Sequence, residues 1–373
     1  MPQSVEYFVI GGGLAGAMAG LRLAEAGRAV LLVERERGPR PKVCGEFLSA
    51  EAVEYLRSGG VDPLRYGAQP VRGMRFSAGA RVVETELPFP ALALSRAVLD
   101  EQLLLRAEER GCTVRRGVTV QQLWRTDGAW QAFTDGGEMV RAEQVVLASG
   151  KHDVRGWMRA QGRQNDLVGF KMRWRLAAGA ARELAGHIEL HQFAGGYGGL
   201  VTVEDGAANL SAVVRRQLLQ RVGGWPGLLV HMRTQNRLLN ERLTGAAAAW
   251  ERPMAIAAIP YGYMAREADG CWRVGDQVAV IPSFTGDGMA IALHSASMAV
   301  ERMLAGASVD AYQRELAAQL RGGMRIATAL SRLMASGGAR LVAPMAMAML
   351  PMVLGSIARA TRIPARAMLV EGV

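Results

Sequence analysis

The first 35 residues show two apolar runs separated by a stretch with helical spacing. Residues 5–10 and 29–34 are the apolar runs, and residues 14–27 carry apolar side chains at helical intervals before a closing glycine. This order predicts a strand, a glycine turn, a helix and a second strand, which together form one βαβ unit. Residues 95–111 predict another helix with a serine as candidate N-cap, and residues 144–148 predict a buried strand.

Between about residues 168 and 263 the pattern changes to alternating and β-rich runs. The strands expected there cover 168–176, 187–193, 199–203 and 209–214, with one helix-like stretch over 227–240. Such alternation is typical of antiparallel sheets, so we predict an inserted, mainly antiparallel domain. The chain then returns to a short strand at 271–274 and a long helix from about 287 to 304.

Residues 341–357 form a nearly continuous apolar stretch that contains four methionines and two prolines. A membrane-spanning helix needs about 20 apolar residues, so no span is predicted. Three interpretations stay open: a pair of buried helices, a helical cap over a substrate pocket, and contact in the plane of a membrane surface. The last is suggested by the flanking Arg340, Arg359 and Arg362.

Composition narrows the class of protein. A chain of 373 residues with 50% hydrophobic positions can bury a large core, which excludes a disordered tail, a peptide hormone and a collagen-like fibre. Its three cysteines lack CxxC spacing, which argues against a zinc knuckle or disulfide framework and predicts a reducing, cytoplasmic setting. No basic leader followed by a long apolar region is visible at the N-terminus.

The net charge of +10 raises the question of an anionic partner. Only Lys42, Lys151 and Lys171 are lysines, so 41 of the 44 basic residues are arginine, and they are scattered without a five-residue basic block. This distribution favours a compositional bias over a functional basic face, and no nucleic-acid partner is expected.

The most specific motif is Gly11-Gly12-Gly13-Leu14-Ala15-Gly16, because it follows an apolar strand and opens a helix. Gly11 permits the tight turn, Gly13 lets the backbone approach a pyrophosphate, and Gly16 lets the helix lie close to the strand. The N–H groups that begin the helix attract the pyrophosphate. Glu34, at the end of the next strand, is expected to accept hydrogen bonds from ribose hydroxyls. The motif predicts a dinucleotide site but does not separate NAD from FAD.

A second glycine-rich segment lies far down the chain. Gly275-Asp276 ends a strand, and residues 281–289, Ile-Pro-Ser-Phe-Thr-Gly-Asp-Gly-Met, lead into a helix. A carboxylate at Asp276 could bind the ribityl hydroxyls of a flavin, and the helix start offers N–H donors to phosphate or to the flavin's pyrimidine carbonyl. Two anion-accepting helix starts suit a long, extended dinucleotide.

With the strand and turn of residues 144–150 between them, the two motifs resemble one superfamily over most of residues 1–310. It is the FAD-dependent superfamily that contains p-hydroxybenzoate-hydroxylase-type monooxygenases, geranylgeranyl reductases and flavin-dependent halogenases. The resemblance implies FAD as cofactor, with Arg96 near its phosphates and Asp276 at its ribityl chain. It also implies NAD(P)H as a transient co-substrate, since no second GxGxxG marks a nicotinamide domain.

Two segments are similar to the geranylgeranyl reductase branch. They are Pro41-Lys42-Val43-Cys44-Gly45-Glu46, and Gly196-Tyr197-Gly198-Gly199 followed by Ala208-Asn209-Leu210. Other positions depart from the patterns of each branch. Ser149-Gly150 stands where hydroxylases carry Asp-Gly, the Trp-x-Trp-x-x-Ile-Pro element of halogenases is missing, and Thr202 and Ser283 replace two prolines usual in the reductases.

Cys44 and Glu46 are the candidate catalytic residues. The resemblance implies that Cys44-Gly45 lies beside the flavin ring, where a thiol could tune its potential or shape the pocket; the alternative is a small buried residue in a turn. Glu46 is either a general acid or a cap for the helix that begins near Ser49. The five histidines lack HExxH spacing, so no metal is expected, and no Gly-x-Ser-x-Gly elbow supports a hydrolase.

We therefore predict an α/β fold with a Rossmann-like FAD-binding domain, an inserted β-rich substrate domain and a C-terminal helical region. The FAD-binding domain is assigned to 1–70, 91–165 and 264–330, the substrate domain to 71–90 and 166–263, and a helical cap or membrane-contact tail to 331–373. The predicted cofactor-binding residues are Gly11, Gly13, Leu14, Ala15, Gly16, Glu34, Arg35, Cys44, Gly45, Arg96, Ala148, Gly150, Gly275, Asp276, Gly286, Asp287, Gly288 and Met289.

The predicted function is that of an FAD-dependent oxidoreductase acting on an apolar small molecule. A monooxygenase on an aromatic, polyketide-like or lipid-like substrate is favoured. The alternatives are a geranylgeranyl-reductase-like reduction of isoprenoid double bonds and, third, halogenation. A flavin-containing binding protein without turnover is the alternative from another class. A peripheral membrane contact through the C-terminal region is a further expectation.

Overall fold

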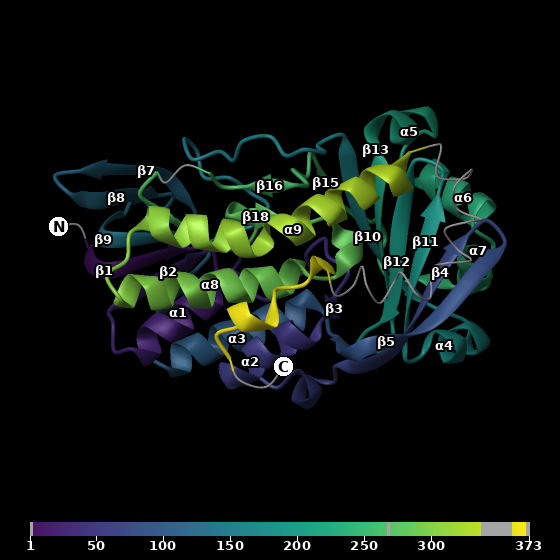
Figure 1. Ribbon diagram of the computed structural model, residues 1–373, viewed down its shortest axis with the longest axis horizontal. Coiled ribbons are helices and arrows are strands. Elements are labelled where there is room, and N and C mark those ends of the chain that lie inside the picture. The colour runs from purple at the N-terminus through teal and green to yellow at the C-terminus, as the bar shows by residue number, and fades with distance from the viewer. Residues whose placement is uncertain (1–2, 267–268, 337–359, 371–373) are drawn as a thin grey trace.

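The computed structural model describes residues 3–266, 269–336 and 360–370, and it contains two large sheets (Figure 1). The first sheet has the order β6-β2-β1-β9-β8-β7, with β17 also paired to β9. Its strands are β1 (Gln3–Ile10), β2 (Val30–Glu34), β6 (Thr113–Arg116), β7 (Val120–Thr126), β8 (Ala129–Thr134), β9 (Met139–Leu147) and β17 (Trp272–Arg273). Strands β6, β2, β1, β9 and β17 are parallel, whereas β7, β8 and β9 form an antiparallel meander.

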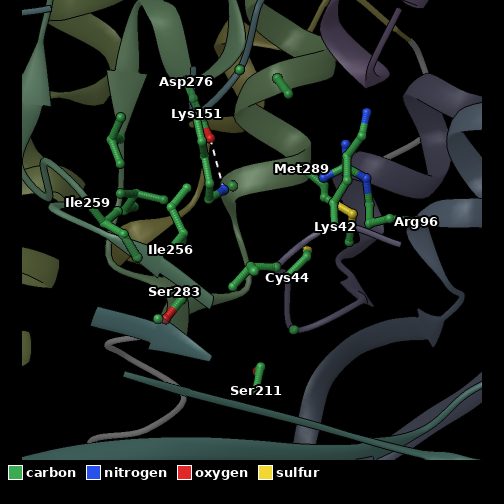
Figure 2. Close-up of a pocket in the computed structure, with 18 of the residues that line it drawn as sticks. Lys42, Cys44, Arg96, Lys151, Ser211, Ile256, Ile259, Asp276, Ser283 and Met289 are labelled. Carbon is green, nitrogen blue, oxygen red and sulfur yellow. Dashed lines mark hydrogen bonds and ion pairs between the residues drawn. The ribbon is translucent and has the colours of Figure 1, made fainter. Parts of the chain in front are cut away.

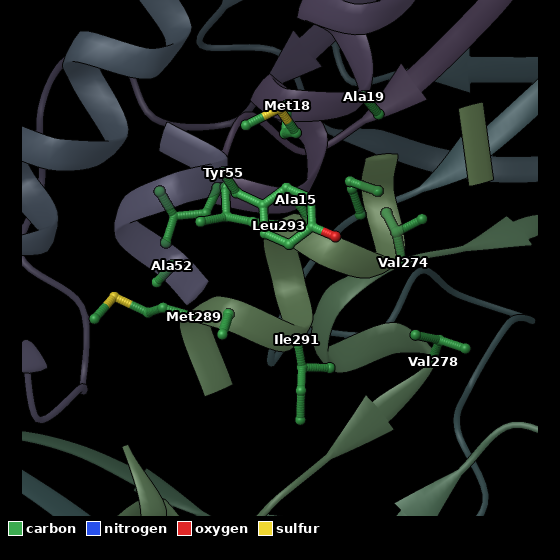
Figure 3. Close-up of a cluster of buried hydrophobic side chains, with 14 of the residues drawn as sticks. Ala15, Met18, Ala19, Ala52, Tyr55, Val274, Val278, Met289, Ile291 and Leu293 are labelled. Atoms are coloured by element: carbon green, nitrogen blue, oxygen red, sulfur yellow. The ribbon is translucent and has the colours of Figure 1, made fainter. Parts of the chain in front are cut away.

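Both faces of the first sheet are buried, because alternate side chains of β1 enter different cores. Tyr7 and Val9 pack under the helices α1 (Leu14–Glu25), α3 (Arg96–Glu109) and α8 (Gly288–Leu304). Helix α2 (Ala50–Ser58) packs against α8, and Figure 3 shows Tyr55 of α2 lying among the side chains of this core. Phe8 and Ile10 point to the other face, where the meander supplies Trp130. The sheet is therefore a central layer with its parallel strands shielded from water.

The second sheet has the order β14-β10-β13-β12-β11-β4-β5-β3, with β15 paired to β10. Its strands are β3 (Phe47–Leu48), β4 (Gln69–Ala78), β5 (Arg81–Ala93), β10 (Leu167–Arg175), β11 (His187–Phe193), β12 (Gly196–Thr202), β13 (Ala208–Arg215), β14 (Ala247–Ala248) and β15 (Met254–Ala257). All its pairs are antiparallel except β4 with β11. The helices of this region are α4 (Ala178–Leu184), α5 (Arg216–Arg221), α6 (Trp225–Gln235) and α7 (Arg237–Leu243).

Helix α9 (Val309–Ala335) joins the two halves. It begins beside α8 and ends against β11 and β12 of the second sheet (Figure 1). The described residues also contain the short strand pair β16 (Tyr263–Met264) and β18 (Ala279–Val280) and the 3-10 turns η1 (Pro63–Tyr66), η2 (Gly275–Gln277), η3 (Ser283–Thr285) and η4 (Ala365–Ala367).

The predicted α/β class, the initial βαβ unit and the helices near residues 95 and 287 are confirmed. The prediction of a single helix over 227–240 is wrong. Asn236 has extended backbone, and its side chain accepts a hydrogen bond from the Leu239 N–H, so Asn236 ends one helix and caps the next. Helices α4, α5 and α9 were not predicted, and α9 runs through residue 331, where we placed the start of the C-terminal region. The apolar stretch 341–357 lies outside the described residues.

Candidate active site: a cavity between the two sheets

A cavity of about 1030 Å³ lies between the first sheet and the second. Its polar half is built from the start of α1, the end of β2, the start of α3 and the segment that leads into α8. Its apolar half is built from the second sheet and the end of α9. Figure 2 shows labelled side chains around one space that come from several of these segments, among them Arg96 at the start of α3, Met289 in α8 and Ile256 in the second sheet. A volume of this order is at the upper end for ligand pockets, so it can hold an extended molecule.

The glycines at the start of α1 have separable tasks. Gly11 has a φ of 108°, and a Cβ there would lie 2.6 Å from the Ala148 carbonyl oxygen. A Cβ on Gly16 would lie 1.8 Å from the Gly11 carbonyl oxygen, so Gly16 allows the helix to pack on the turn. Gly13 is the N-cap, lines the cavity and provides no side-chain cap. The first N–H groups of α1 therefore remain available to an anion.

Two cations border the space in front of Gly13. A Cβ on Gly13 would lie 3.3 Å from Lys42 Nζ and 3.7 Å from an Arg96 guanidinium nitrogen. Both cations bind Asp100, Lys42 at 2.8 Å and Arg96 at 2.6 Å. Burial opposes ionisation of Asp100, but these two charges hold the pKa of its carboxyl below the usual value. Two cations against one carboxylate leave a net positive charge at a helix N-terminus, which fits a diphosphate.

Glu34 ends β2 at the same cavity. Its Oε2 accepts from the Gly12 N–H at 2.7 Å and its Oε1 accepts from the Glu36 N–H at 3.0 Å. These bonds fix the carboxylate beside the glycine turn, where it can accept from ribose hydroxyls. Neighbouring Arg35 also lines the cavity and pairs with Glu36 at 3.1 Å.

The other end of the polar half is formed by η2 and the start of α8. Asp276 pairs with Lys151 Nζ at 2.9 Å, and this cation holds the pKa of the partly buried carboxyl below its usual value although burial opposes it. Gly286, with a φ of 75°, and Gly288 line the cavity where α8 begins. Asp287 differs from both, because it is buried behind the cavity wall, and burial raises the pKa of its carboxyl to about 7.

The Cys44-Gly45 turn projects into the cavity and is held from the second sheet. Asn209 Nδ2, on β13, donates to the carbonyl oxygens of Cys44 and Gly45, both at 3.1 Å. The Cys44 thiol lines the cavity and accepts from the Glu46 N–H at 3.4 Å. A Cβ on Gly45 would lie 3.6 Å from Ser211 Oγ, which shows how close the turn comes to β13.

Glu46 occupies a left-handed conformation with a φ of 61°, and its side chain is completely buried. The carboxylate contacts Lys171 Nζ, accepts from an Arg173 guanidinium at 3.2 Å and accepts from the Arg96 N–H at 2.9 Å. The suggestion that Glu46 caps the helix near Ser49 is wrong, because Ser49 caps α2 itself. Glu46 instead anchors the turn to β10 and to the start of α3. A general-acid role for Glu46 stays a prediction.

The apolar half is lined by side chains from β4, β5, β10, β11, β12, β15 and α9. From these elements come Met74, Phe76, Leu87, Phe89, Phe170, Ile188, Leu190, Tyr197, Met254, Ile256, Leu330, Leu333 and Met334, and the segment after β15 and η3 add Ile259, Tyr261 and Phe284. Burial raises the pKa of Tyr261 to about 12 and raises that of Tyr197 further, so both phenols are neutral at physiological pH. This half of the cavity suits a long apolar substrate.

Of the predicted cofactor-binding residues, all line the cavity except Gly16 and Asp287, which lie behind its wall. Sequence reasoning missed Lys42, Lys151, Lys171 and Asn209 as site residues. The lysines carried a signal, because they are the only three in the chain and all three meet carboxylates at or next to this cavity. Lysine carries a compact charge on a flexible stem, which suits each of these positions beside a carboxylate.

Comparison with known proteins adds an independent view. Residues 4–176 match the FAD binding domain family. The chain is 26% identical over 332 residues to a menaquinone reductase of Mycolicibacterium smegmatis, covering 83% of this chain and 79% of that protein. It is 29% identical over 305 residues to digeranylgeranylglycerophospholipid reductase 2 of Methanopyrus kandleri, covering 76% and 73%. The myxobacterial chondrochloren halogenase CndH shares the fold, with a TM-score of 0.77, 21% identity and coverage of 98% and 95%.

Proposed function

Since the chain belongs to the FAD-dependent oxidoreductase superfamily and uses FAD, we propose that it is a reductase that saturates isoprenoid carbon–carbon double bonds in a lipid. In this reaction each double bond takes up two electrons and two protons. NAD(P)H is the proposed source of the electrons, and it binds transiently.

The observation that carries this proposal is the long apolar half of the cavity, which opens directly from the polar half beside Cys44 and Gly45. Menaquinone and digeranylgeranylglycerophospholipid, which the names of the two relatives specify, both carry isoprenoid chains. The sequence favoured a monooxygenase and kept the reductase as the alternative. The relatives support the alternative, and we therefore place it first.

The residues of this chain bind and orient the reactants. FAD, when bound, supplies a carrier that accepts and donates two electrons. The start of α1, with Lys42 and Arg96, would hold its diphosphate, and Glu34 would hold the adenosine ribose. Asp276 and the start of α8 would hold the ribityl and flavin end. The apolar walls exclude water and align an isoprenoid chain toward the Cys44-Gly45 turn.

The test is an anaerobic turnover experiment with the full-length, FAD-loaded protein. Detergent-solubilised menaquinone and a geranylgeranyl-chain phospholipid are offered separately with NADH, NADPH or dithionite as reductant. After any quinol has been reoxidised in air, mass spectrometry is expected to show that the isoprenoid chains have gained pairs of hydrogen atoms in reactions run without oxygen. If turnover occurs with dithionite but not with NADH or NADPH, the assignment as a reductase holds and the electron donor is a compound other than NAD(P)H.

Two outcomes would overturn the proposal. The first is an absence of hydrogenated product from either lipid with every reductant, although the flavin is reduced. The second is a product that contains one added oxygen atom and forms only when oxygen is admitted, which would return the assignment to a monooxygenase.

A further inference from the structure

The second half of α9 has an ordered set of stripes along its surface. Arg321, Arg325 and Arg332, spaced by four and seven residues, share an exposed stripe. Next to it lie Ile326 and Leu333, seven residues apart, which are 39% and 44% exposed although both are large and apolar. The helix therefore presents cations and exposed apolar side chains side by side.

The next stripe connects this surface with the cavity. Leu330 and Met334, four residues apart, line the apolar half together with Leu333. Leu333 is thus both a wall of the cavity and an exposed side chain. The end of α9 is consequently a mouth of the apolar half, at the place where Figure 1 shows the helix reaching the second sheet.

The charged side chains of α9 after Leu320 have a single sign. None of Arg321, Arg325 and Arg332 forms an ion pair with a carboxylate in the described part of the chain, and Arg332 contacts only the Arg163 carbonyl oxygen. Along the sequence, residues 316–370 contain seven arginines and no aspartate or glutamate. An overall arginine bias does not by itself produce a 55-residue stretch without acids in a chain that has 34 acidic residues.

We propose that the exposed face of α9 after Leu320 rests on the headgroup layer of an anionic bilayer, and that lipid substrate enters the cavity at Leu333. Binding requires only the surface, whereas the entry route rests on the proposed function. Arginines pair with anionic headgroups while neighbouring apolar side chains enter the acyl boundary, as in helices that lie in the membrane interface. Within the described residues, no helix is long and apolar enough to span a bilayer.

The face fits a bilayer better than a protein partner because its two components match the two layers of a membrane surface. The cations lie along one edge, and the apolar side chains continue without a break into a cavity large enough for a lipid chain. A hydrophobic substrate that leaves the bilayer through such a mouth avoids contact with water.

The test measures sedimentation of the FAD-loaded, full-length protein with vesicles of phosphatidylcholine alone and with added phosphatidylglycerol. Wild type is expected to bind the anionic vesicles and to lose binding at high salt. The Arg321→Gln, Arg325→Gln double variant should weaken this binding about thirtyfold, at about 1 kcal/mol per arginine. Its matched control is Arg81→Gln, Arg182→Gln, which removes two exposed arginines on β5 and α4.

The apolar contribution is tested by Ile326→Gln, with Val230→Gln as control because Val230 is 65% exposed on α6. Ile326→Gln should weaken vesicle binding several-fold and Val230→Gln should not. The arginine double variant should reduce turnover of substrate held in anionic vesicles and keep turnover of detergent-solubilised substrate. The vesicle-binding measurements need no substrate, so their outcome does not depend on whether the proposed reaction is correct.

Three outcomes would overturn the proposal. One is that the wild-type protein sediments equally with both kinds of vesicle, or that it binds neither kind. Another is wild-type binding by the α9 double variant. The third is a concentration-dependent dimer that Ile326→Gln abolishes in the absence of vesicle binding, which would assign the face to a second copy of the chain.

Discussion

The Lys171 ammonium group and the Glu46 carboxylate form an ion pair in which both side chains are completely buried. Lys171 belongs to β10 of the second sheet, whereas Glu46 follows the Cys44-Gly45 turn that enters the polar half of the cavity. Lys171 also donates to the Lys42 carbonyl oxygen at 3.1 Å. One side chain of the substrate region thus fixes the segment that carries two candidate cofactor contacts.

Replacing Lys171 by Met should destabilise the protein by about 3–5 kcal/mol, because a buried carboxylate loses a cationic partner. The double variant Lys171→Met, Glu46→Gln should lower the free energy of unfolding by less than Lys171→Met alone, because it also removes the buried carboxylate charge. Urea unfolding monitored by circular dichroism measures both. A cost below about 1 kcal/mol for Lys171→Met would show that Arg173, at 3.2 Å from Glu46, suffices alone.

Asn209→Leu tests whether the turn must be held for FAD to bind. The change keeps the approximate volume and removes both hydrogen bonds to the Cys44 and Gly45 carbonyl oxygens. At about 1 kcal/mol for each bond, the Kd for FAD should rise up to about thirtyfold. Titration of apoprotein by flavin fluorescence gives the value, with the exposed Asn240→Ala as control. A folded variant with unchanged Kd would contradict this role.

Gly13→Ala should reduce FAD affinity at least about tenfold and leave the stability of the apoprotein nearly unchanged. Gly13 has a φ of −75°, which alanine also adopts, so the added Cβ acts by filling space 3.3 Å from Lys42 Nζ. Gly179→Ala is the matched control, since a Cβ there meets no atom within 4 Å on α4. Equal FAD content in both purified variants would refute a diphosphate position in front of Gly13.

Asp287 predicts a pH dependence with a defined sign. Burial raises its folded-state pKa to about 7, above an unfolded value of about 3.9. Between these pH values the folded protein keeps a proton that the unfolded chain has released. The contribution of Asp287 to stability is therefore lost as the pH rises from about 3.9 to about 7. The free energy of unfolding of Asp287→Asn should equal that of wild type near pH 4. Near pH 8 it should exceed the wild-type value by at most about 4 kcal/mol.

Thermal unfolding of both proteins across this pH range provides the measurement. The difference in Tm between Asp287→Asn and wild type is expected to grow with pH and to level off above about pH 8. A difference that stays constant, or that shrinks as pH rises, would be incompatible with a raised pKa at this carboxyl.

Local patterns predicted the parts of the site that neighbouring residues determine. The turn at Gly11 and the close packing at Gly16 depend on backbone geometry within a few residues, so the glycine spacing revealed them. The same holds for the glycines that precede α8, where Gly286 adopts a left-handed conformation. Such features need no knowledge of the second sheet.

Contacts made across the fold could not be predicted in this way. Asn209 reaches Cys44 because β13 pairs with β10 in a particular register, and that pairing depends on the whole antiparallel sheet. Glu46 illustrates the same limit, since its partners Lys171 and Arg173 are more than 120 positions away. The sequence pattern alone left its role divided between an acid and a helix cap.

The order in which the cavity walls occur along the chain has a consequence during synthesis. The start of α1 emerges from the ribosome early, but Asn209 comes much later and α8 begins only at Gly288. A nascent chain shorter than this lacks the far wall of the FAD site, so cofactor capture has to wait until more than three quarters of translation is complete. Retained flavin therefore reports that both sheets have assembled.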